Sequence, residues 1–143
     1  MTQSASRTIL VVDDQPDIRL MCRVNLALEG YEVAEAMDGA AALAALDRIK
    51  PDLILLDVMM PGVDGWQVLD AIKADPELEH IPVVILTARV QREDELRGWS
   101  AGASEYLSKP FNPSTLTEVV QRVLLHRDDS ERRRRAIEKL SII

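Results

Sequence analysis

The sequence predicts an α/β fold in which a five-stranded parallel sheet carries helices on both faces. Three observations support this prediction. Short apolar, β-branched runs alternate five times with longer amphipathic segments along the 143 residues. Several of these runs are continuously apolar, as expected for strands that are buried on both faces. The connections between the segments are short, which is typical of repeated strand–helix units in one open sheet.

The five strands are predicted where the apolar runs occur. The runs at 8–12, 52–56 and 82–87 are dominated by Val, Ile and Leu, so we expect them in the middle of the sheet. The run at 31–36 is less apolar and is expected nearer an edge, and 105–108 is a short fifth strand.

The helices are predicted between the strands, at 14–29, 38–49, 66–74, 93–101 and 113–126. Pro16 suits the first turn of the first helix, and Gly30 suits its C-terminal end. The second helix ends before Pro51, and Gly102 follows the fourth. The fifth helix has an apolar side made of Leu116, Val119, Val120, Val123 and Leu124.

The composition describes an acidic globular chain with a basic C-terminal segment. The net charge is −7, yet residues 126–143 hold six basic and four acidic side chains, which leaves −9 for the rest. This balance argues against direct nucleic-acid binding. Cys22 is the only cysteine, which suits a reducing compartment. The polar N-terminus has no signal-peptide core, and no apolar run reaches the ~20 residues of a membrane span, so we expect a cytoplasmic protein without membrane contact.

Polar residues follow four of the five predicted strands. Asp13 and Asp14 follow the first strand, Asp57 the third, and Lys109 the fifth, while Thr87 ends the fourth. Ligands of open parallel sheets bind at the carboxyl ends of the strands, so these side chains are expected to converge on one edge. Each signal alone is weak, since an Asp after a strand is often a turn former or a helix cap. Their joint placement predicts a functional site.

The residue types at this edge favour a hard cation and a phosphoryl group. Three close carboxylates repel one another until a cation or proton neutralises them. Oxygen ligands without histidine or cysteine favour Mg²⁺ over Ca²⁺ or zinc. A metal, an ammonium and a hydroxyl together provide the positioning and charge neutralisation that phosphoryl transfer requires. A free carboxylate can act as the nucleophile and become an aspartyl phosphate.

At these positions the sequence resembles the receiver domains of two-component response regulators, which have the CheY-like, flavodoxin-like fold. The resemblance covers about residues 7–126 and is carried by Val11-Val-Asp-Asp14, Leu55-Leu-Asp-Val-Met-Met-Pro-Gly-Val-Asp-Gly65, Leu86-Thr-Ala88, Gly102-Ala103 and Tyr106-Leu-Ser-Lys-Pro-Phe111. It implies the strand order 2-1-3-4-5. It also implies a receiver domain at 1–126, followed by a charged helical extension or linker at 127–143.

The resemblance implies a phosphoacceptor and a metal site. Asp57 would accept the phosphoryl group from a sensor histidine kinase or a phosphotransfer protein. Asp14 would bind Mg²⁺ directly, Asp13 would assist, and Met59 would contribute its backbone carbonyl, with Mn²⁺ as a substitute metal. The protein would be a signalling switch rather than an enzyme, with only self-phosphorylation from small donors and self-dephosphorylation.

The resemblance also implies how the phosphoryl group is held and sensed. Lys109 would pair with it, and the backbone N–H of Ala88 would bind one of its oxygens. Thr87 would move to hydrogen-bond it while Tyr106 rotates inward. The peptide bond between Lys109 and Pro110 would be cis, a form that only proline makes inexpensive.

Met59 and Arg89 are expected to tune the lifetime of the phosphorylated state, because the family places these positions beside the path of the hydrolytic water. Within the family, Met59, Arg89 and the segment 109–113 resemble receivers of the OmpR/PhoB type. Two features depart from that type: Ser104-Glu105 stands where two aspartates are usual, and Val119 where an arginine is usual. These positions belong to that type's dimer contacts, which puts the same mode of dimerisation in doubt here.

Two other functions share part of this pattern. A phosphohydrolase of the haloacid dehalogenase type also uses an Asp at a strand end as its nucleophile. That family has the motif Asp-x-Asp there, with a second Asp two residues after the nucleophile. In this sequence the residue two positions after Asp57 is Met59. A phosphorylation-independent adaptor could keep the receiver fold, although degenerate receivers usually lack one of the acidic or lysine residues present here. The expected partners are the kinase or phosphotransfer protein, a downstream protein or output domain outside this chain, and a second copy in a homodimer.

The tail at 127–143 has a helical pattern with two open interpretations. Asp128 and Glu131 match the spacing of a capping box, and Ala136, Ile137, Leu140 and Ile143 follow helical spacing. The tail could extend the fifth helix, or start a new one, and pack on a second subunit or a partner. Alternatively, it is the beginning of a linker to an effector.

Overall fold

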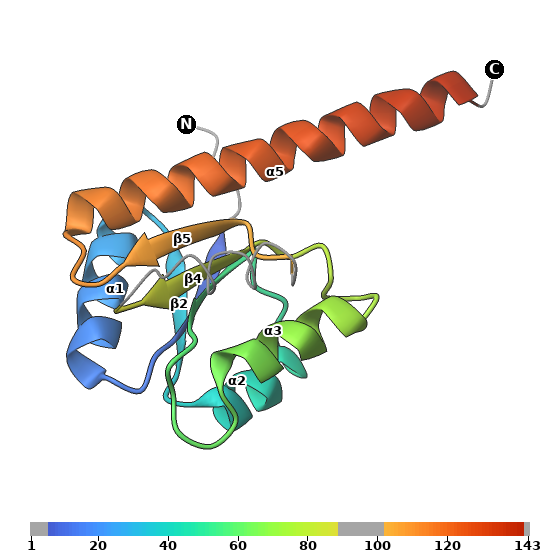
Figure 1. The fold of residues 1–143 in the computed structure, drawn as a ribbon. Coiled ribbons are helices and arrows are strands. Elements are labelled where there is room, and N and C mark those ends of the chain that lie inside the picture. The colour runs from blue at the N-terminus through green and yellow to red at the C-terminus, as the bar shows by residue number, and fades with distance from the viewer. Residues whose placement is uncertain (1–5, 89–101, 142–143) are drawn as a thin grey trace.

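The computed structural model describes residues 6–88 and 102–141, which form one parallel sheet with helices on both faces (Figure 1). The strands are β1 (Thr8–Val12), β2 (Glu32–Ala36), β3 (Leu53–Asp57), β4 (Val83–Thr87) and β5 (Glu105–Ser108). The helices are α1 (Pro16–Leu28), α2 (Gly39–Leu46), α3 (Gly65–Ala74) and α5 (Pro113–Ser141). The predicted helix at 93–101 lies outside the described residues.

The strand order is β2-β1-β3-β4-β5, and every pair is parallel, as predicted. Alternate residues of the central strands face opposite sides. Ile9 and Leu55 belong to the core beneath α1 and α5, whereas Leu10 and Ile54 belong to the core beneath α2 and α3. Both faces are therefore closed by helices, which explains why the central strands are continuously apolar.

The helix starts follow from local capping. The Asp38 carboxylate accepts a hydrogen bond from the Ala41 N–H at 2.7 Å, so α2 begins one residue later than predicted. Asp64 and Gln67 form a reciprocal capping box at the start of α3. Pro16 occupies the first turn of α1, as predicted. Apart from α5, the predicted and observed ends of the described elements differ by three residues or fewer.

The sequence predicted a fifth helix at 113–126 and left open whether the tail at 127–143 extends it; the structure shows the extension. The helix continues without a break from Pro113 to Ser141, and its C-terminal half projects beyond the sheet (Figure 1). No Gly or Pro follows Pro113 to interrupt it. Asp128 is therefore not the cap of a new helix; its carboxylate instead pairs with Arg7 at 2.6 Å.

Arg127 anchors the middle of α5 to the edge of the sheet where the strands begin. Its guanidinium donates to the Asp52 backbone carbonyl at 2.8 Å. The Asp52 carboxylate in turn accepts the Thr8 N–H at 2.8 Å. This chain of bonds links α5, β3 and β1, so the helix direction is set where it leaves the body.

Two glycines allow loops to approach the sheet closely. A Cβ on Gly65 would lie 2.3 Å from the Asp57 backbone oxygen, and one on Gly39 would lie 2.2 Å from the Val63 oxygen. These distances are shorter than any side chain tolerates. The start of α3 therefore packs directly on the backbone that ends β3.

We expect Gly65→Ala to destabilise the fold by about 1–3 kcal/mol, since the added methyl group must push backbone away from backbone. Chemical denaturation would measure the loss, and the amide chemical shifts of Asp57 and Val58 should change. Asp70→Ala is the control, because Asp70 is an exposed residue of the same helix and its replacement adds no atom beside the β3 backbone. Unchanged shifts of Asp57 in the Gly65 variant would contradict the close packing.

Candidate phosphoacceptor and metal site

The predicted polar residues meet at the edge of the sheet where the strands end. The register pairs Val12 with Leu56, so the next residues, Asp13 and Asp57, leave neighbouring strands side by side. Asp13 is fully buried and Asp57 is 3% exposed. Buried carboxylates need hydrogen bonds or counter-charges, so their partners define the site.

Backbone N–H groups hold both buried carboxylates. The Gln15 N–H donates to Oδ1 of Asp13 at 2.9 Å, and the Met59 N–H donates to Oδ1 of Asp57 at 2.9 Å. In each case the donor lies two residues after the Asp, as in Asx turns. The loops that leave β1 and β3 therefore orient the second oxygens toward a shared centre.

Lys109 provides the counter-charge at that centre. Its Nζ lies 2.7 Å from Oδ2 of Asp13 and 3.4 Å from Oδ2 of Asp57. The Lys109 N–H donates to the Thr87 carbonyl at 2.7 Å, which fixes the residue just past β5 beside the end of β4. The Lys109–Pro110 peptide bond is cis.

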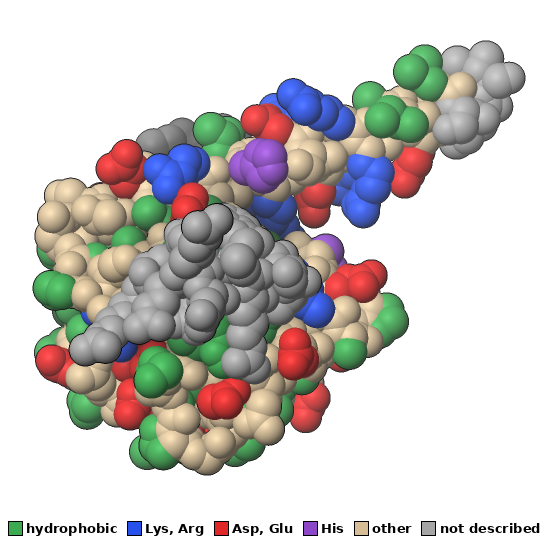
Figure 2. Space-filling model, in the orientation of Figure 1, with side chains coloured by type: hydrophobic (Ala, Val, Ile, Leu, Met, Phe, Trp, Pro, Cys, Tyr) green, Lys and Arg blue, Asp and Glu red, His purple; other side chains and the backbone are tan. Residues whose placement is uncertain are grey.

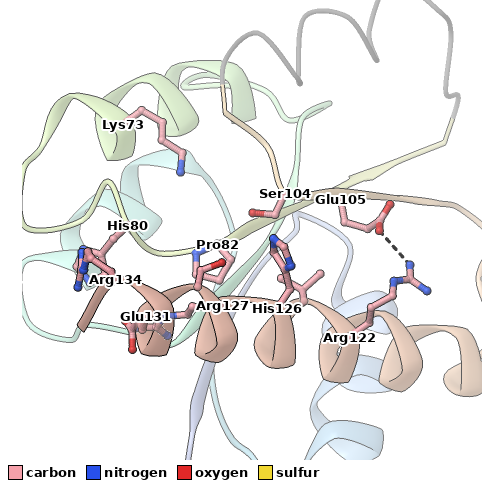
Figure 3. A pocket seen from close by; sticks show the side chains of 12 residues that line it. Lys73, His80, Pro82, Ser104, Glu105, Arg122, His126, Arg127, Glu131 and Arg134 are labelled. Atoms are coloured by element: carbon pink, nitrogen blue, oxygen red, sulfur yellow. Dashed lines mark hydrogen bonds and ion pairs between the residues drawn. The ribbon is translucent and has the colours of Figure 1, made fainter. Parts of the chain in front are cut away.

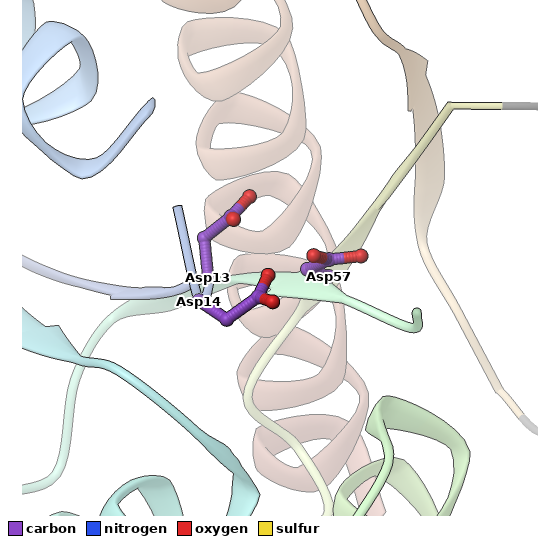
Figure 4. Close-up of side chains that lie close together, drawn as sticks. All are labelled: Asp13, Asp14 and Asp57. Atoms are coloured by element: carbon purple, nitrogen blue, oxygen red, sulfur yellow. The ribbon is translucent and has the colours of Figure 1, made fainter. Parts of the chain in front are cut away.

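Asp14 completes an acidic cluster. One carboxylate oxygen from each of Asp13, Asp14 and Asp57 lies within 4.8 Å of the others (Figure 4). Unlike the other two, Asp14 is exposed. Three ionised carboxylates beside one ammonium leave two negative charges. All the side-chain atoms that could bind a metal ion here are carboxylate oxygens. This donor set fits a divalent, hard cation such as Mg²⁺.

The environment perturbs both charged partners. Burial raises the pKa of Asp57 to about 6, with Asp13 acting in the same direction, while the Met59 hydrogen bond and Lys109 oppose it. Burial lowers the pKa of Lys109, but its ion pairs with Asp13 and Asp57 outweigh that effect, and the net pKa is raised. Lys109 therefore stays charged at neutral pH.

The remaining predicted residues surround this centre. Thr87 ends β4 and is 3% exposed, and Ala88 follows it at the surface. Tyr106 lies on β5, partly buried against the core beneath α2 and α3. The Met59 side chain is 72% exposed. Arg89 lies outside the described residues.

Sequence reasoning missed two residues at the site. The Gln15 side-chain oxygen accepts a hydrogen bond from Lys109 Nζ at 3.2 Å, which gives the ammonium a third oxygen partner. Gly65 lets α3 approach the Asp57 backbone. Gln15 lies between the acidic pair and Pro16. This position indicates the start of a helix but gives no signal of a contact with Lys109. Gly65 belongs to the segment 55–65 that carries the family resemblance, but its close packing against the Asp57 backbone was not predicted.

Comparisons with known proteins agree with this geometry. The family model for the response regulator receiver domain matches residues 9–121. The response regulator PleD of Caulobacter vibrioides is 51% identical over 108 residues, covering 75% of this chain and 24% of that protein. The phosphate regulon transcriptional regulatory protein PhoB of Pseudomonas aeruginosa is 41% identical over 118 residues, covering 82% of this chain and 52% of that protein.

A solved structure shows the same fold. Chemotaxis protein CheY4 of Vibrio cholerae superposes with a TM-score of 0.80 at 38% identity, covering 83% of this chain and 99% of that one. The present chain spans only about a quarter of PleD and about half of PhoB. Among the described residues, no helix has the length and hydropathy that a membrane span requires.

The similarity to PhoB supports the resemblance to OmpR/PhoB-type receivers. Family match, relatives and fold all lead to the same assignment. The chain belongs to the response regulator receiver domain family, whose general function is to accept a phosphoryl group as a signalling switch.

Proposed function

We propose that Asp57 is the phosphoacceptor and that the donor is the phosphohistidine of a sensor histidine kinase or of a phosphotransfer protein. The observation that carries this proposal is the pairing of one lysine ammonium with two buried strand-end carboxylates, at 2.7 Å and 3.4 Å. A structural ion pair alone needs one carboxylate. The second carboxylate and the exposed Asp14 beside it supply ligands for a cation and a nucleophile.

In the proposed reaction a carboxylate oxygen of Asp57 attacks phosphorus while the bond from phosphorus to the donor nitrogen breaks. The electron pair of that bond stays on the imidazole, and Asp57 becomes an acyl phosphate. Lys109 lies within 3.4 Å of the nucleophile and balances charge on the transferred oxygens. The Met59 N–H holds the other carboxylate oxygen, so the nucleophile is oriented before the donor arrives.

Asp13, Asp14, Asp57 and the Met59 carbonyl would hold Mg²⁺, for which Mn²⁺ can substitute. The bound cation would neutralise the carboxylates and the incoming phosphoryl oxygens. The support for this assignment is the all-oxygen donor set and its two uncompensated negative charges. Small phosphoryl donors would use the same site, which gives the receiver self-phosphorylation.

Thr87 and Tyr106 are the proposed switch. Thr87 is nearly buried at the end of β4, and the register pairs its neighbour Leu86 with Leu107, the residue after Tyr106. A hydrogen bond from Thr87 to the phosphoryl group, with another from the Ala88 N–H, would shift the resting equilibrium and draw Tyr106 inward. The surface around β5 and α5 would report the change to a partner.

The proposed setting is a cytoplasmic two-component pathway. The kinase or phosphotransfer protein acts upstream, and a downstream protein or an output domain outside this chain acts downstream. A homodimer is one way to read out the switch, and the projecting half of α5 is available to it. The acidic net charge of −7 argues against direct contact with nucleic acid.

Asp57→Asn should abolish labelling by acetyl phosphate and Mg²⁺, because the amide cannot form the acyl phosphate. Intact mass spectrometry should show one added phosphoryl group on the wild type and none on the variant. Asp70→Asn on α3 is the matched control, since Asp70 is exposed and outside the acidic cluster. Normal labelling of Asp57→Asn would exclude this residue as the acceptor.

Asp14→Ala should weaken Mg²⁺ binding by at least about tenfold, because one of three carboxylates is lost. Calorimetric titration would measure the affinity, and the Mg²⁺-dependent rise in Tm should shrink in parallel. Asp17→Ala removes a nearby exposed carboxylate of α1 outside the cluster and serves as the control. The ligand role is wrong if both variants bind Mg²⁺ as the wild type does.

Met59 and Arg89 are proposed to slow self-dephosphorylation by hindering the water that attacks phosphorus. Met59→Asn should therefore speed the decay of the phosphorylated protein once donor is removed, with the extent of labelling unchanged. Leu125→Asn is the control, because it replaces another exposed apolar side chain, at 60% exposure, on α5 and outside the acidic cluster. Equal decay rates in the wild type and both variants would contradict the proposed role of Met59.

A further inference from the structure

A second site lies at the opposite edge of the sheet, where α5 runs past the body. There a groove with a volume of about 560 Å³ opens between α5 and the segments that precede β4 and β5, represented by Pro82 and Ser104. We call it the α5 groove. The strands begin at this edge, whereas the acidic cluster lies where they end. The groove therefore shares no residue with the phosphoacceptor site.

The α5 groove is lined by a concentration of basic side chains: Lys73, His80, Arg122, His126, Arg127 and Arg134 (Figure 3). Its two carboxylates, Glu105 and Glu131, are already engaged by Arg122 at 2.9 Å and by Arg127 at 3.7 Å. The four Lys and Arg side chains exceed the two carboxylates by two positive charges, in a chain of net charge −7.

Two cations in the groove remain available to a ligand. The Arg134 guanidinium makes no ion pair with a carboxylate among the described residues. Lys73 Nζ donates only to the Glu79 backbone carbonyl, at 2.9 Å. Burial lowers the pKa of Lys73, partly offset by Glu79, so an anion at the groove would favour its charged form. Figure 3 shows Lys73 reaching from α3 toward α5.

The groove exists because α5 is long. His126, Ser130 and Arg134 follow one another at intervals of four residues, so they form one face of the helix, and all three line the groove. Figure 2 shows blue and purple side chains facing the hollow beneath the projecting helix. The arginine run of the tail is therefore divided: Arg134 lines the groove, whereas Arg133 and Arg135 are exposed and do not.

We propose that the α5 groove binds a pyrophosphate group, either free or carried by a nucleotide. Arginine and lysine recognise phosphate oxygens through charge-assisted hydrogen bonds. The basic side chains come from both walls, with Lys73 and His80 on the body and Arg134 and His126 on α5, which suits an extended anion better than a single phosphate. The volume is within the range of small-molecule sites.

A ligand held from both walls would tie the projecting part of α5 to the body. The helix is anchored to the sheet by Arg127, but residues 132–140 are all exposed. Contacts from Arg134 to an anion that Lys73 also holds would restrain this segment. The site would therefore couple a phosphate-bearing metabolite to the direction of the helix that leaves the domain.

Calorimetric titration of the full chain with pyrophosphate, and separately with ADP, tests the proposal in Mg²⁺-free buffer. We expect saturable binding of one ligand per chain. Arg134→Gln and Lys73→Gln should each weaken it by about tenfold or more, because each removes a charge-assisted hydrogen bond. Arg133→Gln changes the net charge equally on the same helix and should bind as the wild type does.

The two ligands distinguish the source of the pyrophosphate group: tighter binding of ADP identifies a nucleotide, and equal binding identifies the free anion. Amide chemical shifts should change at Lys73, at Ser104 and along 122–134. The proposal is overturned if neither ligand saturates, if Arg133→Gln weakens binding as much as Arg134→Gln, or if the shifts cluster at Asp13, Asp57 and Lys109 instead.

Discussion

The ion pairs between the Lys109 ammonium and the carboxylates of Asp13 and Asp57 are the interaction on which the strand-end edge of this receiver depends. Asp13 is fully buried and Asp57 nearly so, and two ionised carboxylates on neighbouring strands would repel each other strongly in such a place. Lys109 reaches both from the loop that follows β5, at 2.7 Å and 3.4 Å. It thereby holds the loop after β5 against the ends of β1 and β3. A phosphoryl group and a divalent cation would enter a site whose charges are already arranged, which is the condition for electrostatic stabilisation without reorganisation.

The other edge of the sheet is arranged for anchoring. Arg127 binds the Asp52 carbonyl, Asp52 binds the Thr8 N–H, and Arg7 pairs with Asp128. These contacts tie α5 to β1 and β3 below the core. The two edges of the sheet therefore differ: the strand ends carry unbalanced negative charge, and the strand starts hold the long helix. The same anchoring creates the basic groove beneath the projecting part of α5.

Close backbone packing connects the strand-end edge to the helices. Gly65 brings the start of α3 against the Asp57 backbone, and Gly39 brings the start of α2 against Val63. The loop that follows Asp57 is therefore held between two helix starts, each with an aspartate cap. A change at Asp57 would therefore bear directly on these contacts, in addition to the proposed route through Thr87 and β5. Interiors this tightly packed transmit strain rather than absorb it.

The sequence by itself determined the parallel sheet, the order of elements and the convergence of Asp13, Asp14, Asp57, Thr87 and Lys109, because apolar runs mark buried strands and polar residues at their ends must meet at one edge. Helix starts were predicted to within two residues, with Pro16 marking the first, because helix initiation is local chemistry. Only the tertiary structure decided the partners of Lys109, the role of Gln15, and the close approach of Gly65, because these depend on the distance between segments far apart in sequence. It also decided that α5 continues to Ser141. A helical tail of this composition is marginal in isolation, but here it extends a helix already held by Arg127 and Asp128, so each added residue needs no new nucleus.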